Sequence, residues 1–235
     1  TNGAFDVTIG KVTDLWGIST DKPKIPDMGE LSSALQSVDY TKLNISDNYV
    51  TVATGSKIDL GALGKGYAAD EAASVMREEG VTSALLTLGG NVYAIGSKPD
   101  GKPFTVGIKD PLGELAYVAV FEIEDTSAVT SGGYERYFEE NGVRYSHIID
   151  PVSGMPVDNG TLSVTVISKS SSDADMLSTA LFVMGKDKAI EFYNNNPNLF
   201  EAIIITGNKS IYTTNNISVS IPDEAISAGY HYAEN

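Results

Sequence analysis

Short runs in which hydrophobic and polar residues alternate, or in which apolar residues follow one another, occur along most of this chain. Alternation with a period of two residues is typical of a β-strand with one buried face. Leu85–Leu88 is instead a continuous apolar run, which indicates a strand buried on both faces. The pattern predicts strands over Phe5–Ile9, within Tyr40–Val52 around a polar turn at Ser46-Asp47-Asn48, and over Leu85–Leu88, Val92–Ile95, Phe104–Ile108, Leu115–Ile123, Leu162–Ser168, Ala202–Thr206 and Ser210–Thr213.

Helical periodicity appears in other segments. The segment Ser170–Gly185 begins with serines and an aspartate, which favour helix N-termini, and it ends on a glycine, which favours a helix C-terminus. A second helix follows Lys65 and stops at Gly80, with one apolar face formed by Ala68, Ala72, Val75 and Met76. The remaining predicted helices are Val12–Trp16, Ser32–Val38 with a cap from Pro26-Asp27 or Ser32, and Ala189–Tyr193.

The strongest hairpin signal is Asn141-Gly142, because both residues tolerate the positive φ angles of a two-residue turn. This turn pairs Phe138 with Tyr145 and Arg136 with His147. His147 then shares the more apolar face with Phe138, Tyr145 and Ile149. A buried structural histidine is the alternative to a functional one at this point.

Glycines also mark breaks between elements. We expect Gly89-Gly90 to be a bulge or a close backbone approach within a strand, and Thr130–Gly133 to be a tight turn. The irregular mixture of strands, hairpins and helices predicts an α+β fold. Two similar lobes, one ending near Gly80–Ile95 and the other near Gly185, would each contribute a helix start to a shared cleft.

Composition and charge exclude several classes of partner and of chemistry. The 235 residues include 16 Lys and Arg against 31 Asp and Glu, a formal charge of −15 that argues against nucleic acid or an anionic membrane surface as partner. The chain has no cysteine, which removes disulfides, thiolate nucleophiles and Cys-ligated metals. No run is long and apolar enough to span a bilayer, and no signal peptide is present. We expect an upstream segment to be missing.

The most informative stretch for chemistry is Ile58–Gly80, which reads IDLGALGKGYAADEAASVMREEG. Glycines at 61, 64 and 66 precede a helix, so free backbone N–H groups and Lys65 would face a phosphate. The stretch is not a Walker A loop, because Asp59 and Gly66 replace the required glycine and Ser/Thr. A glycine-rich turn without a ligand explains the pattern equally well.

Carboxylates in two places are candidates for a site. Asp175 and Thr179 lie four residues apart on the predicted helix Ser170–Gly185, so a carboxylate and a hydroxyl share a face that suits a hard divalent cation. An ordinary helix surface is the alternative. Asp6 is the polar residue of interest near the N-terminus, and a solvated turn aspartate is its alternative.

Taken in order, several stretches resemble the FAD:protein FMN transferases, the ApbE-like flavin transferases that were long labelled thiamine-biosynthesis lipoproteins. The resemblance covers essentially the whole chain and implies one ApbE-like domain over residues 1–235, with two related α+β motifs and the flavin in the cleft between them. The matching stretches are GAFDVTIG (Gly3–Gly10), DLWG (Asp14–Gly17), DLGALGKGYAAD (Asp59–Asp70), TLGGN (Thr87–Asn91), TSGGYERY around Ser131, SHIIDPVSGMPV (Ser146–Val157) and DADMLSTALFVMG (Asp173–Gly185).

The resemblance also implies roles for individual residues. The metal, Mg²⁺ with Mn²⁺ as the alternative, would be held by the carbonyl of Ala62 and the side chains of Asp175 and Thr179; Ser178 stands where some members carry an acidic residue. FAD contacts fall on Ala4, Phe5, Asp6, Asp59, Lys65, His147 and Ile149, and the catalytic group comprises His147, Asp175 and Lys65. Family members carry a further N-terminal segment and a lipoprotein signal, which implies an extracytoplasmic, lipid-anchored protein.

The implied reaction moves FMN from FAD to a Thr or Ser hydroxyl of an acceptor flavoprotein and releases AMP. Cleavage of a phosphoanhydride depends mostly on positioning and charge neutralisation, which a divalent cation and Lys65 would supply. His147 would take the proton of the acceptor hydroxyl or orient that hydroxyl. Two alternatives remain open: a metal-dependent FAD pyrophosphatase that gives AMP and FMN, and a non-catalytic flavin-binding protein.

Overall fold

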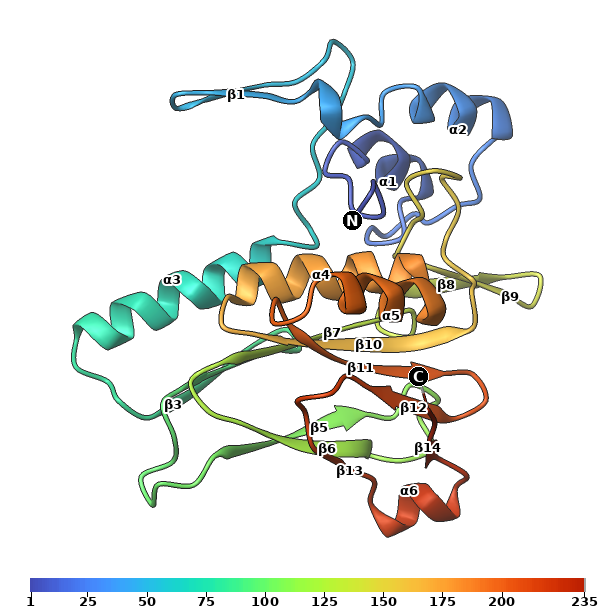
Figure 1. Cartoon of the computed structure of the whole chain (residues 1–235). Helices are drawn as coiled ribbons and strands as arrows, with labels where there is room; N and C mark the ends of the chain where they lie inside the picture. Colours follow the sequence, from blue (N-terminus) through green and yellow to red (C-terminus); the bar gives the residue numbers. More distant parts are fainter. Residues whose placement is uncertain (235) are drawn as a thin grey trace. The chain divides into compact units, whose positions relative to one another are not determined.

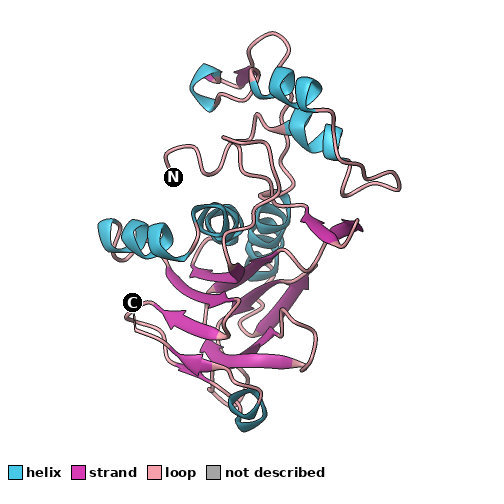
Figure 2. Cartoon of the chain, turned by 90° about the vertical axis from the view of Figure 1, so that its right-hand side faces the viewer, coloured by secondary structure: helices cyan, strands magenta, loops and turns pink. Residues whose placement is uncertain are grey.

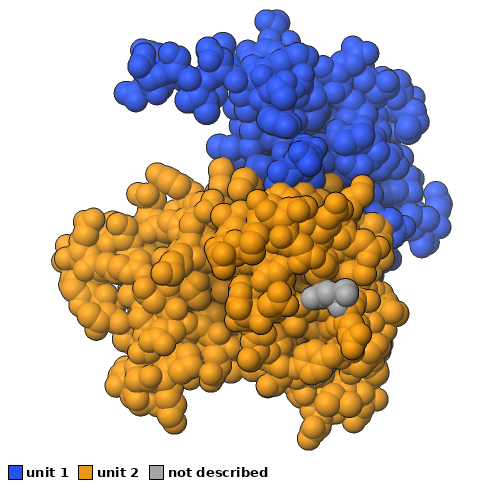
Figure 3. Space-filling model, viewed as in Figure 1, with its two compact units in different colours: residues 1–61, 133–158 blue, residues 62–132, 159–235 orange. Residues whose placement is uncertain are grey.

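The structure of the chain is a computed structural model that describes residues 1–234. These residues form two compact units (Figure 3). Unit 1 comprises Thr1–Gly61 and Gly133–Asp158, and unit 2 comprises Ala62–Gly132 and the chain from Asn159 onward. The chain therefore leaves each unit and returns to it, so each unit is assembled from residues distant in sequence.

Unit 1 is built from short elements around a small core. Trp16 and Val12 of α1 pack with Leu31 of α2, and the Trp16 indole donates a hydrogen bond to the Gly154 carbonyl at 2.7 Å. The elements are α1 (Gly10–Trp16), α2 (Met28–Leu35), the 3₁₀ turn η1 (Tyr40–Lys42), the hairpin β1 (Asn44–Ser46) and β2 (Tyr49–Thr51), and the hairpin β8 (Tyr137–Glu140) and β9 (Val143–Ser146).

The predicted β8–β9 hairpin is confirmed. Phe138 pairs with Tyr145, and Asn141 and Gly142 both have positive φ angles of 53° and 78°. The two paired rings stack with centroids 5.1 Å apart and pack against Trp16. Phe138 and Tyr145 therefore face the unit 1 core.

The strand predicted over Phe5–Ile9 is wrong. Asp6 turns the chain there, because its carboxylate accepts hydrogen bonds from both the amide and the hydroxyl of Thr8, at 2.8 and 2.6 Å. A side chain that bonds the backbone two residues ahead stabilises a turn rather than an extended strand. Among the described residues, the β-type contact of this segment is an isolated bridge between Ile9 and Lys57.

Unit 2 is built on a seven-stranded sheet in the order β14-β12-β11-β10-β7-β4-β3 (Figures 1 and 2). All neighbouring strands run antiparallel except β12 and β14. The strands are β3 (Ala84–Leu88), β4 (Asn91–Ile95), β7 (Ser127–Gly132), β10 (Thr161–Ser168), β11 (Glu201–Thr206), β12 (Ser210–Thr213) and β14 (His231–Tyr232).

Different layers cover the two faces of this sheet (Figure 1). Helices α3 (Gly64–Glu78), α4 (Ser171–Met184) and α5 (Lys186–Asn195) lie on one face. The three-stranded sheet of β5 (Phe104–Lys109), β6 (Tyr117–Ile123) and β13 (Val219–Ser220) packs on the other, where residues such as Phe121 and Ile203 share a core. A short helix, α6 (Asp223–Ser227), adjoins β6. The predicted α+β class is confirmed.

Three predictions about strands are wrong. Ser127–Gly132 forms strand β7 inside the sheet, not a turn at Thr130–Gly133. Gly89-Gly90 is the two-residue turn of the β3–β4 hairpin, with φ angles of 56° and 98°, not a bulge. Leu85–Leu88 is not buried on both faces, because β3 is an edge strand and Leu85 is 44% exposed.

The predicted face of α3 and the predicted lobes also need correction. Gly66, Ala69 and Ala73 form the buried face of α3. Of the predicted face, Met76 packs against this cluster, whereas Ala68 and Val75 are exposed. Helices α3 and α4 pack against each other within unit 2, so the two helix starts belong to one unit and not to two lobes. Among the described helices none is long and apolar enough to cross a membrane.

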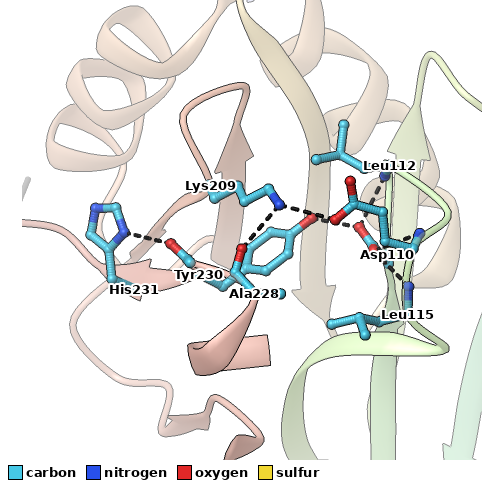
Figure 4. Close-up of polar contacts among 9 residues, drawn as sticks. Asp110, Leu112, Leu115, Lys209, Ala228, Tyr230 and His231 are labelled. Carbon is cyan, nitrogen blue, oxygen red and sulfur yellow. Dashed lines mark hydrogen bonds and ion pairs between the residues drawn. The ribbon is translucent and has the colours of Figure 1, made fainter. Parts of the chain in front are cut away.

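A buried carboxylate ties the β5–β6 loop to the C-terminal segment (Figure 4). Asp110 accepts hydrogen bonds from the hydroxyl of Tyr230 at 2.5 Å and from the backbone amides of Leu112, Glu114 and Leu115. Burial alone would raise the pKa of Asp110, but the hydrogen bonds from Tyr230 and these amides outweigh it and hold the pKa below its ordinary value. Burial and the bond to Asp110 raise the pKa of Tyr230.

Candidate functional site

The first group of predicted site residues lies in unit 2, where the start of α3 meets the second turn of α4. The buried carboxylate of Asp175 accepts a hydrogen bond on Oδ2 from the Gly66 amide at 2.9 Å. Its Oδ1 lies 3.7 Å from the ammonium of Lys65, whose side chain is 40% exposed. The structure thus brings Lys65 and Asp175 together, as the predicted site requires.

Gly66 is required by the packing of the two helices. A Cβ at this position would lie 2.3 Å from the Ser171 carbonyl oxygen and 2.8 Å from Cβ of Asp175. Gly64 has open space where its Cβ would lie. The glycine-rich stretch therefore has two functions: Gly66 allows close contact between helices, and Gly64 leaves room beside the helix start.

Helices α3 and α4 each carry an aspartate that accepts hydrogen bonds from backbone amides at the start of the other helix. Asp175, in the second turn of α4, accepts from an amide in the first turn of α3. Asp70, in the second turn of α3, accepts from the Ser171 and Ser172 amides at the start of α4, both at 2.8 Å. It also accepts from the Ser172 hydroxyl at 2.6 Å. Each helix N-terminus is thus stabilised by a carboxylate of the other helix.

Thr179 lies one turn beyond Asp175 on α4. Its hydroxyl is 3.1 Å from the Ser131 hydroxyl of β7, which also bonds Ser178 at 2.8 Å. Ser178 is buried and bonds the Asp175 carbonyl at 2.9 Å. Ser131 and Asp70 were not predicted as site residues, although the serines at 170–172 indicated a helix start that a carboxylate would stabilise.

The donor set of this group suits a hard cation. Asp175 offers a carboxylate, Thr179 a hydroxyl, and Ala62, in the turn just before α3, a backbone carbonyl. All three donors are oxygens, the ligands that Mg²⁺ prefers. Within residues 1–234 no three His, Cys, Asp or Glu side chains are grouped to hold a metal. A cation here would therefore depend on a single carboxylate and on neutral oxygens or a ligand.

The second group of predicted residues lies in unit 1. Asp59, His147 and Ile149 line a cavity of about 310 Å³ together with residues of α1 and the loop that follows it. The Asp59 carboxylate accepts from the Thr13 hydroxyl at 2.7 Å and from the Gly61 amide at 2.8 Å. Thr13 and Trp16 also line this cavity and were not predicted.

His147 is half-buried, and its Nδ1 lies 3.1 Å from the Arg136 carbonyl oxygen. The backbone amide of His147 bonds the same oxygen at 3.0 Å, which confirms the predicted pairing with Arg136. His147 lines the cavity, so it differs from the fully buried structural histidine that was the alternative.

Asp6 is buried, which excludes the solvated turn that was its alternative. Its Oδ2 accepts from the Tyr40 amide at 3.0 Å, and its Oδ1 accepts from Thr8. The carboxylate therefore holds the N-terminal loop against η1. Ala4 and Phe5 precede it in this loop and are half-buried. That these three residues contact FAD stays a prediction.

This chain matches known proteins over most of its length. A family model described as "ApbE family" matches residues 1–204. A protein of Treponema pallidum named FAD:protein FMN transferase is 37% identical over 226 residues, which cover 89% of this chain and 62% of that protein. A protein of Klebsiella pneumoniae with the same name is 36% identical over 214 residues, covering 89% and 66%. The chain therefore spans less than two thirds of the length of these curated relatives.

Solved structures give the same family. The crystal structure of the ApbE protein from Thermotoga maritima has a TM-score of 0.80 and 35% identity, covering 95% of this chain and 71% of that one. The flavinyl transferase ApbE from Pseudomonas stutzeri, in its apo form, has a TM-score of 0.76 and 31% identity, covering 97% and 69%. With a family model that matches most of its length and relatives above 30% identity, this chain belongs to the ApbE family and has an α+β fold like that of the ApbE crystal structures.

Proposed function

We propose that this chain is the catalytic part of a Mg²⁺-dependent FAD:protein FMN transferase, which moves FMN from FAD to a Thr or Ser hydroxyl of an acceptor flavoprotein and releases AMP. The names of the relatives support the reaction class. The observation that carries the proposal is the buried Asp175 carboxylate with an ammonium and a helix N-terminus beside it. A pair of this kind, next to the open space at Gly64, suits an anionic ligand that arrives with its own cation.

The proposed transfer is a substitution at phosphorus. The acceptor hydroxyl oxygen forms a bond to the phosphorus of the FMN half, the bond from that phosphorus to the bridging oxygen breaks, and AMP leaves with that oxygen. The hydroxyl proton passes to a general base, the role that the resemblance gives to His147, whose ring lines the unit 1 cavity and whose Nδ1 lies 3.1 Å from a backbone carbonyl. Lys65 binds a phosphate oxygen as charge develops. Mg²⁺ held by Asp175, Thr179 and the Ala62 carbonyl would neutralise the diphosphate.

The test uses the full-length protein, FAD, Mg²⁺ and a candidate acceptor. Mass spectrometry of the acceptor is expected to show the mass of one FMN on a Thr or Ser, together with an equal amount of AMP. AMP and FMN released without an acceptor adduct would instead identify a pyrophosphatase. FAD that stays bound and unchanged would identify a flavin-binding protein.

The resemblance also supports an extracytoplasmic location on a lipid anchor for the full-length protein. Metabolic labelling with a fatty-acid analogue, followed by membrane fractionation, tests this placement. Label on a full-length protein in the membrane fraction is the expected result, and an unlabelled protein in the cytoplasmic fraction would contradict it.

A further inference from the structure

The side chain of Asn91, the first residue of β4, is 1% exposed, and the described residues offer its amide nitrogen no hydrogen-bond partner. A buried N–H group without a partner has lost its hydrogen bonds to water and has gained none in return. Such groups are rare in folded proteins, and each one needs an explanation. Asn91 belongs to none of the residues that the resemblance assigns to metal or FAD.

The direction of this side chain follows from the alternation along β4. Tyr93 and Ile95 pack on Ala69 and Ala73 of α3, while Ala94 packs in the core on the opposite face of the sheet. Asn91 has the same parity as Tyr93 and Ile95. Its amide therefore points to the face of the sheet that carries the helices.

The start of α3 lies over this end of β4. A Cβ on Gly89, in the turn just before Asn91, would lie 3.2 Å from Cδ of Lys65. At the other end of the strand, Arg77, near the end of α3, bonds Asp125 at 2.7 Å, and Asp125 accepts from the amide of Gly96, which directly follows β4, at 3.2 Å. Helix α3 thus runs in the same direction as β4, with its N-terminal turn at the Asn91 end.

Helix α4 places Asp175 over the same row of the sheet. Its Ser171 bonds Ser127 of β7 at 2.9 Å, and its Thr179 bonds Ser131 at 3.1 Å. Asp175 lies midway between them and therefore above Val129. Strands β4 and β7 are antiparallel and Val92 pairs with Ala128. Asn91, which precedes Val92, therefore lies opposite Val129, which follows Ala128.

We propose that Asn91 is a further ligand-binding residue of the unit 2 site, whose side-chain amide donates a hydrogen bond to a diphosphate oxygen. The inference rests on the proposed function and adds a residue to it. Lys65, Gly64 and the N-terminus of the 15-residue helix α3 all favour an anion at this place. The Asn91 amide adds a neutral hydrogen-bond donor from the sheet to these groups. A bound diphosphate would give that amide the partner that the described residues do not offer.

A structural role and a ligand-binding role of Asn91 predict different effects of Asn91→Leu on FAD affinity. If Asn91 is only a structural residue, Asn91→Leu removes a buried, unpaired donor and leaves FAD affinity unchanged. If Asn91 binds the ligand, the same change leaves the ligand-free protein equally stable or more stable, but it weakens FAD binding about tenfold to a hundredfold, the range for a hydrogen bond to a charged group. Asn91→Asp is expected to weaken binding further, because it places a second carboxylate beside the diphosphate.

The matched control is Ser163→Ala. Ser163 is also fully buried, its hydroxyl also lacks a partner among the described residues, and its strand, β10, belongs to the same sheet. It pairs with Ile205, which packs in the core on the opposite face of the sheet. Ser163→Ala should therefore leave FAD affinity within twofold of the wild type.

The experiment measures thermal unfolding of the ligand-free chains and FAD binding by calorimetry at fixed Mg²⁺, for wild type, Asn91→Leu, Asn91→Asp and Ser163→Ala. A second measurement, on the wild type alone, follows the Asn91 side-chain amide by ¹⁵N NMR during titration with ADP and Mg²⁺, and it remains decisive if a variant does not fold. A large shift of that amide signal is expected. FAD affinity within twofold of the wild type in a folded Asn91→Leu protein, or an unmoved amide signal, would overturn the role of Asn91 alone. Absence of FAD binding by the wild type would overturn the proposed function and this inference together.

Discussion

Asp70→Ala tests how much the hydrogen bonds between Asp70 of α3 and the start of α4 contribute to stability. Asp70 accepts from two backbone amides at 2.8 Å and from the Ser172 hydroxyl at 2.6 Å, all at the start of α4. A side chain that caps a helix N-terminus contributes about 0.5–2 kcal/mol, and hydrogen bonds to a charged group contribute about 1.5–3 kcal/mol. Since these contributions overlap, we expect Asp70→Ala to lower the free energy of unfolding of unit 2 by about 2–4 kcal/mol.

Urea and thermal unfolding measure this loss, with the melting temperature falling by roughly 2–4 °C for each kcal/mol. Asp173→Ala is the matched control, because Asp173 is an exposed carboxylate in the first turn of the same helix. Within residues 1–234 its carboxylate has no hydrogen bond or ion pair and can interact only with the helix dipole, so its removal should cost at most about 1 kcal/mol. Equal losses in the two variants would refute the argument that Asp70 holds the two helices together.

A second readout distinguishes positioning from stability alone. Asp70 fixes the first turn of α4 against α3, and Asp175 follows in the next turn. Asp70→Ala should therefore weaken Mg²⁺-dependent FAD binding even at temperatures where the variant is fully folded. The control Asp173→Ala should bind as the wild type does. Unchanged binding by folded Asp70→Ala would limit Asp70 to a structural role.

Three further predictions concern single residues. Asp175→Asn keeps an oxygen for the Gly66 amide, so the fold should persist while metal-dependent turnover is lost; retained turnover, measured as AMP release, would remove the proposed metal role. Lys65→Met should weaken FAD binding about tenfold to a hundredfold if the ammonium binds a phosphate oxygen; an affinity within twofold in a calorimetric titration would show that the lysine only balances Asp175. Tyr230→Phe should cost about 1–3 kcal/mol near pH 7, and the cost should shrink as the pH falls through the lowered pKa of Asp110, whose ordinary value is 3.8, because protonated Asp110 no longer offers a charged acceptor. Urea unfolding of both chains across this acidic range checks the last prediction, and a difference independent of pH would contradict it.

Features determined by neighbouring residues were predicted well from the sequence. The Asn141-Gly142 turn fixed the register of β8 and β9 because only residues tolerant of positive φ suit that turn. Helix α4 also matched its prediction, with the Ser170 hydroxyl accepting from the Asp173 amide at the start and Gly185 at the end. Both signals act within a few residues, where sequence and structure are most directly linked.

Strand β7 was missed because its polar side chains have partners far away in the sequence. Ser127 bonds Ser171, Ser131 bonds Ser178, and Thr130 bonds Thr165. Ser127 and Ser131 thus bond α4, and Thr130 bonds the neighbouring strand β10. These hydroxyls give β7 the polar composition of a loop. An apolar pattern could not reveal a strand whose polar groups are satisfied by tertiary hydrogen bonds.

Only part of the candidate site could be predicted from the sequence, because only some of its residues are unusual among their sequence neighbours. Lys65 and Asp175 stood out because a lysine in a glycine-rich turn and a carboxylate near a helix start are unusual in their local context. Asp70 and Asn91 did not, because Asp70 lies within a helix among other acidic residues and Asn91 follows a turn. Their importance comes from what faces them across the helix pair and the sheet, and this information requires the fold.

The two carboxylate oxygens of Asp175 have different partners, one in the packing of the helices and one at the candidate ligand site. Oδ2 accepts from the Gly66 amide and so belongs to the contact between helices, whereas Oδ1 faces the Lys65 ammonium at 3.7 Å. A carboxylate anchored through one oxygen keeps the other in a fixed place, which is what binding of a cation requires. Lys65, with 40% of its side chain exposed, is free to turn towards an anion when another cation takes its place beside Oδ1. In a chain with a formal charge of −15, the proposed exchange of cations would provide positive charge where an anionic ligand would bind, and carboxylates beyond the screening length of about 8 Å would have little influence there.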